Sequence, residues 1–123
     1  MQRSGSPIAD IPAFAFRISA EDVSTYRRAL GVGGDRAPFG MALQALASEA
    51  VLRALKDMAA GRHPIHVAQA YTAERPLHAD VDYHCEVSLQ PNGADRLRIM
   101  QRLTDPSGNT CLFLVSEIVL VSP

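Results

Sequence analysis

The spacing of apolar residues changes close to Gly61, and only a short alternating stretch at residues 13–19 precedes the helical part of the chain. Between residue 19 and Gly61 the spacing is near 3.6 residues, which predicts helices over residues 19–31 and 39–60. The other patterned stretches alternate between apolar and polar positions, which is typical of strands. These stretches lie at residues 13–19, 65–73, 81–89, 96–104 and 110–121, and the last is apolar almost throughout.

The first helix has recognisable ends. Ser19 can cap its first turn, and Gly31 can end it. Its apolar stripe consists of Val23, Tyr26 and Leu30. We therefore expect a short helix with one packed face.

The second helix is long enough to raise the question of a membrane span. Its second half carries Glu49, Arg53, Lys56 and Asp57, and several central charges argue against insertion into a bilayer. The first half is apolar on nearly all sides, so we expect one helix over residues 39–60 that is buried in the core. The residues expected to be mostly buried are Leu43, Leu46, Ala50 and Leu55.

The four later strands are expected to form an antiparallel meander. Asn92-Gly93 is a strong hairpin signal, and residues 105–109 form a second turn signal. The alternation places Ile65, Val67 and Tyr71 together on one face. The stretch at residues 81–89 alternates most regularly: its inward residues are Val81, Tyr83, Cys85, Val87 and Leu89.

A sheet with one apolar face needs a covering layer, and the long helix is the only element able to supply it. The predicted fold is therefore α+β: an antiparallel sheet curled around one long central helix, which is the hot-dog arrangement. Residues 1–12 are expected to form a flexible arm, and residues 13–123 one domain. One helix leaves apolar sheet surface uncovered, so we expect a dimer with a sheet that continues across two chains.

Composition narrows the function classes. The net charge of the 123-residue chain is −1, which gives no electrostatic basis for binding nucleic acid or an acidic membrane. Cys85 and Cys111 are too few for a disulfide framework or a metal cluster, and they are expected to be buried thiols. The first 15 residues lack the apolar core of a secretory signal. A cytoplasmic protein without a metal is therefore expected.

Three stretches resemble the MaoC-like hydratases and dehydratases. APFGMALQALASEAVL is similar to the start of the family's central helix, usually close to I-A-H-G-M-L. HVAQAYTAERPLHADVDYHCEVSL resembles the strand pair that follows, with Ala79-Asp80 in place of the family's Gly-Asp, and ISAEDVSTYRRALG fits the opening helix. The resemblance implies a hot-dog fold and an acyl-thioester ligand, carried by coenzyme A or acyl carrier protein, with no other cofactor.

The departure from the family concerns its catalytic segment. Active members carry an Asp and a His ahead of the central helix, in text like D-x-N-P-x-H-x-D, and the two activate water. Here Asp35 stands in GGDRAPFG, but no His follows it before the helix. The shortened pattern is similar to non-catalytic half-domains that pair with a catalytic hot-dog subunit. A general base is typically worth about 10²–10⁴-fold in rate, so we expect poor hydratase activity from the chain alone.

The expected binding residues lie at the start of the central helix. They are Pro38, Phe39, Gly40 and Met41. By resemblance, the amides of Gly40 and Met41 would hold the thioester carbonyl, as free N–H groups of a first helical turn are able to do. The alternative is that Gly40 only allows close packing of the helix against the sheet.

Asp35 and Glu49 are the candidate catalytic carboxylates, and each has a simpler explanation. Asp35 lies in a Gly-rich loop where a turn residue is common, and Glu49 can pair with Arg53 one helical turn later. Three functions remain open. The first is an acyl-thioester-binding relative of the (R)-enoyl hydratases, as a homodimer or with another hot-dog subunit. The others are an acyl-CoA thioesterase that uses Glu49 or Asp35, and a non-catalytic interaction subunit.

Overall fold

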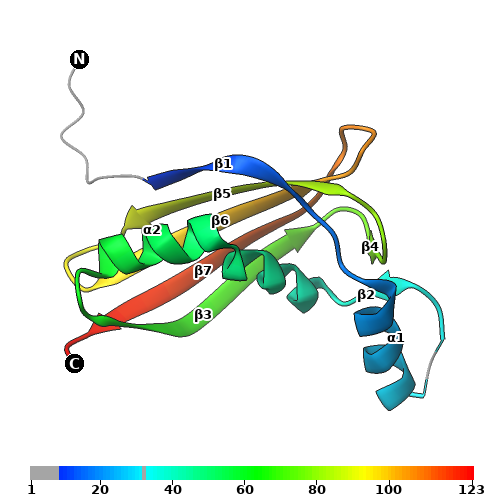
Figure 1. The fold of residues 1–123 in the computed structure, drawn as a ribbon, viewed down its shortest axis with the longest axis horizontal. Helices are drawn as coiled ribbons and strands as arrows, with labels where there is room; N and C mark the ends of the chain where they lie inside the picture. Colours follow the sequence, from blue (N-terminus) through cyan, green and yellow to red (C-terminus); the bar gives the residue numbers. More distant parts are fainter. Residues whose placement is uncertain (1–8, 32) are drawn as a thin grey trace.

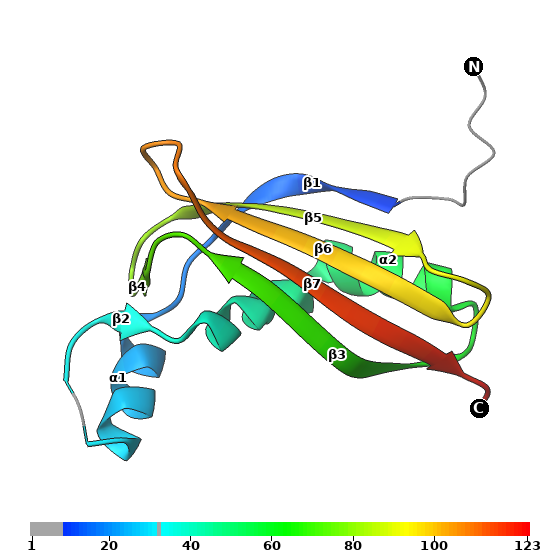
Figure 2. The ribbon, with the colours of Figure 1, turned by 180° about the vertical axis from the view of Figure 1, so that it is seen from behind.

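The computed structural model describes residues 9–31 and 33–123 and contains one five-stranded antiparallel sheet (Figure 1). A helical layer lies along one face of this sheet, as the reverse view also makes clear (Figure 2). The strands, in the order in which they pair, are β1 (Ala9–Phe16), β5 (Tyr83–Pro91), β6 (Arg96–Thr104), β7 (Thr110–Val121) and β3 (His63–Ala73). The predicted α+β architecture, a sheet covered by central helical residues, is confirmed.

The helical layer is two segments rather than one helix. A 3-10 helix, η1 (Phe39–Ala47), is followed by an α-helix, α2 (Glu49–Ala59). Ser48 lies between them with an extended backbone, φ −63° and ψ 150°, and its side chain accepts a hydrogen bond from the Val51 amide. A residue with an extended backbone cannot continue a helix, so Ser48 ends η1 and acts as the N-cap of α2.

The break at Ser48 also changes which residues face the sheet. Ala50, expected in the core, is exposed, and the three expected leucines are only half-buried. A single helix would advance by a constant angle per residue, and the extended residue interrupts that phase. The residues that the helical layer buries are Ala42, Ala45, Val51 and Ala59.

The sheet order corrects the predicted four-strand meander. Strands β5, β6 and β7 form a meander, but β3 pairs with β7 and not with β5. The connection from Glu74 to Asp82 is long enough to separate β3 from β5, and β1 occupies the free edge of β5. Both β1 and β3 are therefore edge strands.

Strand β3 contains a bulge that sequence periodicity does not reveal. His66 pairs with Ile118 and Ala68 with Glu117, so Val67 is an extra residue in the ladder. An extra residue reverses the alternation beyond it. Ile65 and Tyr71 consequently lie on opposite faces: Ile65 pairs with the half-exposed Val119, and Tyr71 with the buried Leu114.

The predicted arm is shorter than expected. Strand β1 begins at Ala9, so residues 9–12 belong to the sheet, and residues 1–8 of the arm lie outside the described residues. Pro12 is tolerated because the register shifts between Ile11 and Phe14 on an edge strand, where a missing N–H costs little.

The remaining elements gather at one end of the sheet. Helix α1 (Ala20–Ala29) lies beyond the sheet's end, beside a small two-stranded ribbon of β2 (Arg36–Ala37) and β4 (Leu77–His78) (Figures 1 and 2). Ser19 caps α1 as predicted, by accepting from the Asp22 amide. Of the expected stripe only Val23 is buried. Within residues 9–31 and 33–123, none of the helices has the length and apolar character that crossing a bilayer requires.

Candidate functional site

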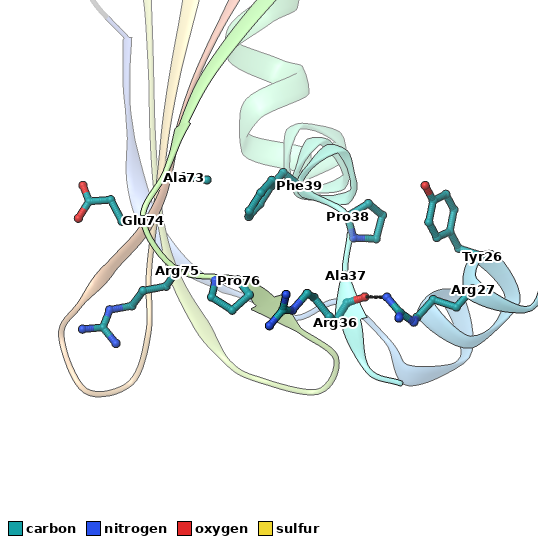
Figure 3. A pocket seen from close by; sticks show the side chains of 10 residues that line it. All are labelled: Tyr26, Arg27, Arg36, Ala37, Pro38, Phe39, Ala73, Glu74, Arg75 and Pro76. Atoms are coloured by element: carbon teal, nitrogen blue, oxygen red, sulfur yellow. Dashed lines mark hydrogen bonds between the residues drawn. The ribbon is translucent and has the colours of Figure 1, made fainter. Parts of the chain in front are cut away.

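A hollow of about 500 Å³ opens between the end of β3 and the start of η1 (Figure 3). Phe39 and Ala73 face each other across it, whereas Glu74 points away. The Phe39 ring also packs against Tyr71 of β3, with 5.4 Å between ring centroids. The expected binding residues Pro38 and Phe39 thus form one wall, and the edge strand β3 forms the other.

The start of η1 offers few free backbone donors. The Met41 amide donates to the Pro38 carbonyl at 3.0 Å and is occupied within the first turn. The Gly40 amide precedes this first bonded amide, so the helical turn gives it no partner. Of the two amides expected to hold a carbonyl, Gly40 is the one available.

Gly40 is not a packing glycine in this chain. Gly40 is exposed, and a Cβ added to it would meet nothing within 4 Å. Its φ is not among the positive values that favour glycine. Close packing of Gly40 against the sheet, the alternative raised by the sequence, is therefore wrong. The open space above its backbone is what a ligand or a second subunit would fill.

Three arginines lie around the hollow. Arg27 donates to the backbone carbonyls of Gly33 and Arg36, so its guanidinium holds the loop that leads into η1. Arg36 and Arg75 line the hollow, and within the described part of the chain neither guanidinium forms an ion pair. Figure 3 shows that the Arg75 side chain is directed away from Phe39, so Arg36 is the cation beside the apolar wall. A cation in this place suits a ligand that is apolar at one end and anionic at the other.

The structure also brings a histidine to Asp35. His78 Nδ1 lies 3.3 Å from Asp35 Oδ1, with 39% of the His78 side chain and 71% of the Asp35 side chain exposed. Asp35 directly precedes β2, and His78 ends β4, whose pairing places Arg36 opposite His78. The pair is thus assembled by the β2–β4 ribbon from positions 43 residues apart.

Backbone bonds hold both members of this pair in place. The Ala79 amide donates to the Asp35 carbonyl at 2.9 Å, and the His78 amide donates to the Tyr83 hydroxyl at 2.8 Å. Tyr83 is 2% exposed, and burial raises the pKa of its hydroxyl. A neutral, fixed phenol therefore anchors the backbone of His78, while the imidazole itself stays accessible.

A second hollow, of about 470 Å³, adjoins the first. His78 lines this second hollow, and the two hollows share Arg75 and Pro76. Its other titratable or charged residues are Arg75, Tyr83, Asp105 and Cys111.

The other candidate residues have structural roles. Glu49 pairs with Arg53 at 3.2 Å on the surface, and 87% of its side chain is exposed. Cys85 and Cys111 are buried free thiols, as expected, and burial raises the pKa of Cys85 to about 12. His84 is exposed on the sheet face away from the helices.

Sequence reasoning missed His78, although it lies within the RPLHAD text that resembles the family. The family pattern places the partner of the Asp in the loop before the helix, and a strand of two residues such as β4 carries no periodic signal in the sequence. The Asp35–His78 contact depends on the pairing of β2 with β4, which only the folded chain reveals.

No protein-family model matches the chain, and no curated protein matches its sequence. Several solved structures do match the fold of the chain. A hot-dog-like protein from Thermanaerovibrio acidaminovorans superposes with a TM-score of 0.69 at 17% identity, over 97% of this chain and 84% of that one. The chain has the hot-dog fold.

Two further hot-dog neighbours have named activities. One is the C-terminally truncated HadBC (3R-hydroxyacyl-ACP dehydratase) complex from Mycobacterium tuberculosis, with a TM-score of 0.69, 16% identity, and coverage of 94% of this chain and 96% of that one. The other is Slr0204, a 1,4-dihydroxy-2-naphthoyl-CoA thioesterase from Synechocystis, with a TM-score of 0.68, 12% identity, and coverage of 93% and 83%. At these identities the likeness establishes the fold alone.

Proposed function

We propose that this chain binds an acyl thioester of coenzyme A or acyl carrier protein, with the acyl carbonyl at the start of η1. The observation that carries the proposal is Gly40, an exposed glycine with open space above it beside the Phe39 hollow. Arg36 supports the proposal, because a phosphopantetheine arm brings a phosphate to the rim of an apolar site.

The reaction that this site supports best is addition of water to an enoyl thioester, or its reversal. This assignment rests on the MaoC-like text around residues 37–52 and 66–89 and agrees with a dehydratase among the structural neighbours. The family's water-activating segment is incomplete here, so we expect slow turnover by the chain alone and full activity with a catalytic hot-dog partner.

Thioester hydrolysis is the second candidate. Thioesterases occur among the structural neighbours, and an Asp–His pair can activate water for hydrolysis as well as for addition. The two reactions give different products, because hydrolysis releases a free thiol and hydration does not.

A second subunit is part of the proposal. Strand β3 is an 11-residue edge strand whose residues are all exposed, and Tyr71 on it touches Phe39. An unprotected edge of this length is suited to pairing with another strand. We expect a homodimer of the isolated chain, or a heterodimer with another hot-dog subunit, that closes the Phe39 hollow. Light scattering of the pure chain should give about twice its mass of 13.3 kDa; a stable monomer would contradict the homodimer.

Calorimetry with butyryl-CoA, which cannot add water, tests the binding site. Gly40→Trp should abolish measurable binding, because the indole would occupy the space above a backbone position where an added Cβ meets nothing within 4 Å. Ala47→Trp is the matched control, since Ala47 is a small exposed residue at the other end of the same helix. Unchanged binding by Gly40→Trp would refute the site.

A further inference from the structure

We infer that His78, oriented by Asp35, is the general base that activates water in this site. The inference rests on the proposed acyl-thioester function and assigns its chemistry to a histidine outside the segment where the related enzymes carry theirs. The sequence left Asp35 without a partner, and the fold supplies one from β4.

The contact with Asp35 favours a different role for each ring nitrogen of His78. Asp35 Oδ1 faces His78 Nδ1, so the carboxylate favours a proton on Nδ1 and leaves the lone pair on Nε2. A base needs a lone pair that points toward an accessible space, and the imidazole lines the second hollow. Asp35 is a positioning residue in this arrangement, since it acts through the imidazole.

The pair lies next to the proposed binding site. His78 is the cross-strand partner of Arg36, which lines the Phe39 hollow. Partners in an antiparallel pair have Cβ atoms about 4.5–5.5 Å apart and point to the same face. The two hollows also share Arg75 and Pro76, so a thin acyl-pantetheine ligand lying across Pro76 contacts both.

The proposed step is balanced without an oxidant or a metal. His78 Nε2 takes a proton from water as the water oxygen bonds to C3 of the enoyl thioester. The C2=C3 electron pair moves toward the thioester carbonyl and forms an enolate, whose oxygen the Gly40 amide stabilises. The imidazolium then returns its proton to C2 and gives a 3-hydroxyacyl thioester. Because the Asp35 side chain is 71% exposed and the His78 side chain 39% exposed, water screens the pair, and we expect this base to support only slow turnover.

The experiment measures hydration of crotonyl-CoA by the full chain and, in parallel, binding of butyryl-CoA. His78→Gln should lower the hydration rate about 10²-fold, the lower end of what a general base contributes, and leave binding unchanged. His84→Gln is the matched control, since His84 is exposed on the opposite face of the sheet. Asp35→Asn should lower kcat with little change in binding.

Two readouts separate a base from a structural residue. Added imidazole should restore part of the rate to His78→Ala, because a small base can occupy the vacated, accessible site. The wild-type rate should fall on the acid side, where a protonated imidazole cannot accept a proton, and His78→Gln should lack this limb. The titratable and charged groups around His78 are its contact Asp35, its cross-strand partner Arg36, and the residues that line the same hollow, which are Arg75, Tyr83, Asp105 and Cys111.

The outcomes distinguish this inference from the proposed function. A wild-type chain that fails to bind butyryl-CoA would remove both. Binding combined with a hydration rate that His78→Gln does not change would overturn the base and keep the binding site. Loss of rate together with loss of binding, without rescue by imidazole, would make His78 structural. Release of free thiol in place of hydration would overturn addition at C3.

Discussion

The two segments of the central helical layer, η1 and α2, are stabilised by different interactions. Helix α2 has its own stop and start signals: Ser48 caps it, Glu49 lies in its first turn, and Ala60 ends it with a left-handed backbone at φ 53°. The 3-10 helix η1 has no side-chain cap, no acidic residue in its first turn and no basic residue in its last turn. Runs of 3-10 helix longer than about four residues are uncommon, so nine residues need outside support.

That support comes from the sheet. Gln101 on β6 is 2% exposed, and its Nε2 donates to the Ala42 carbonyl of η1 at 2.7 Å. Its Oε1 is buried without a hydrogen-bond partner among the described residues. A buried amide oxygen without a hydrogen-bond partner costs free energy, and the bond that Nε2 donates to η1 offsets part of that cost. The segment with the proposed binding site is thus the one that depends on tertiary contacts.

Replacing Gln101 should give the largest effect and test this comparison directly. Gln101→Leu keeps the side-chain volume and removes the bond to η1, so the free energy of unfolding should fall by about 1–3 kcal/mol. Amide hydrogen exchange should accelerate in η1 more than in α2, and butyryl-CoA should bind more weakly. Urea unfolding and exchange measured residue by residue check these expectations.

A control on the same strand sharpens that result. Ile99→Val, at a position two residues earlier on the same buried face, should cost about 0.5–1.5 kcal/mol through lost packing. It should leave the relative exchange rates of η1 and α2 as they are in the wild type. Equal acceleration in both segments of Gln101→Leu would mean that η1 is not specially dependent on the sheet.

The contrast between local signals, as in α2, and contacts distant in sequence, as in η1, also explains which parts of the fold could be predicted from the sequence. Regular alternation on β5 and β6 and the turn at Asn92-Gly93 are local signals, and they gave the right strands and hairpin. The break at Ser48 was missed because the apolar spacing continues past it, although Ser followed by an acidic residue is a cap signal. The bulge at Val67 and the pairing of β3 with β7 arise from contacts distant in sequence, which periodicity cannot report.

The candidate site divides in a similar way. Pro38 and Phe39 could be proposed from a short motif, and the structure places both beside a hollow. The Met41 amide donates a hydrogen bond to the Pro38 carbonyl, as in a 3-10 turn, and the apolar spacing of the helix did not predict this bond. Asp35 could be proposed as a carboxylate, but its partner His78 is brought to it by two strands of two residues each.

The smallest predicted effect lies on α2 and tests whether this half has any chemical role. Glu49→Gln should lower the free energy of unfolding by only about 0.2–0.5 kcal/mol, because it removes one exposed pair with Arg53. Butyryl-CoA binding and the hydration rate should not change, and no thiol-releasing activity should be lost. Arg53→Gln should give a similar loss of stability, and the double variant little more, since both single changes remove the same pair. A tenfold loss of thioester turnover in Glu49→Gln alone would place catalysis on α2, and the division between a supporting α2 and a ligand-binding η1 would then be wrong.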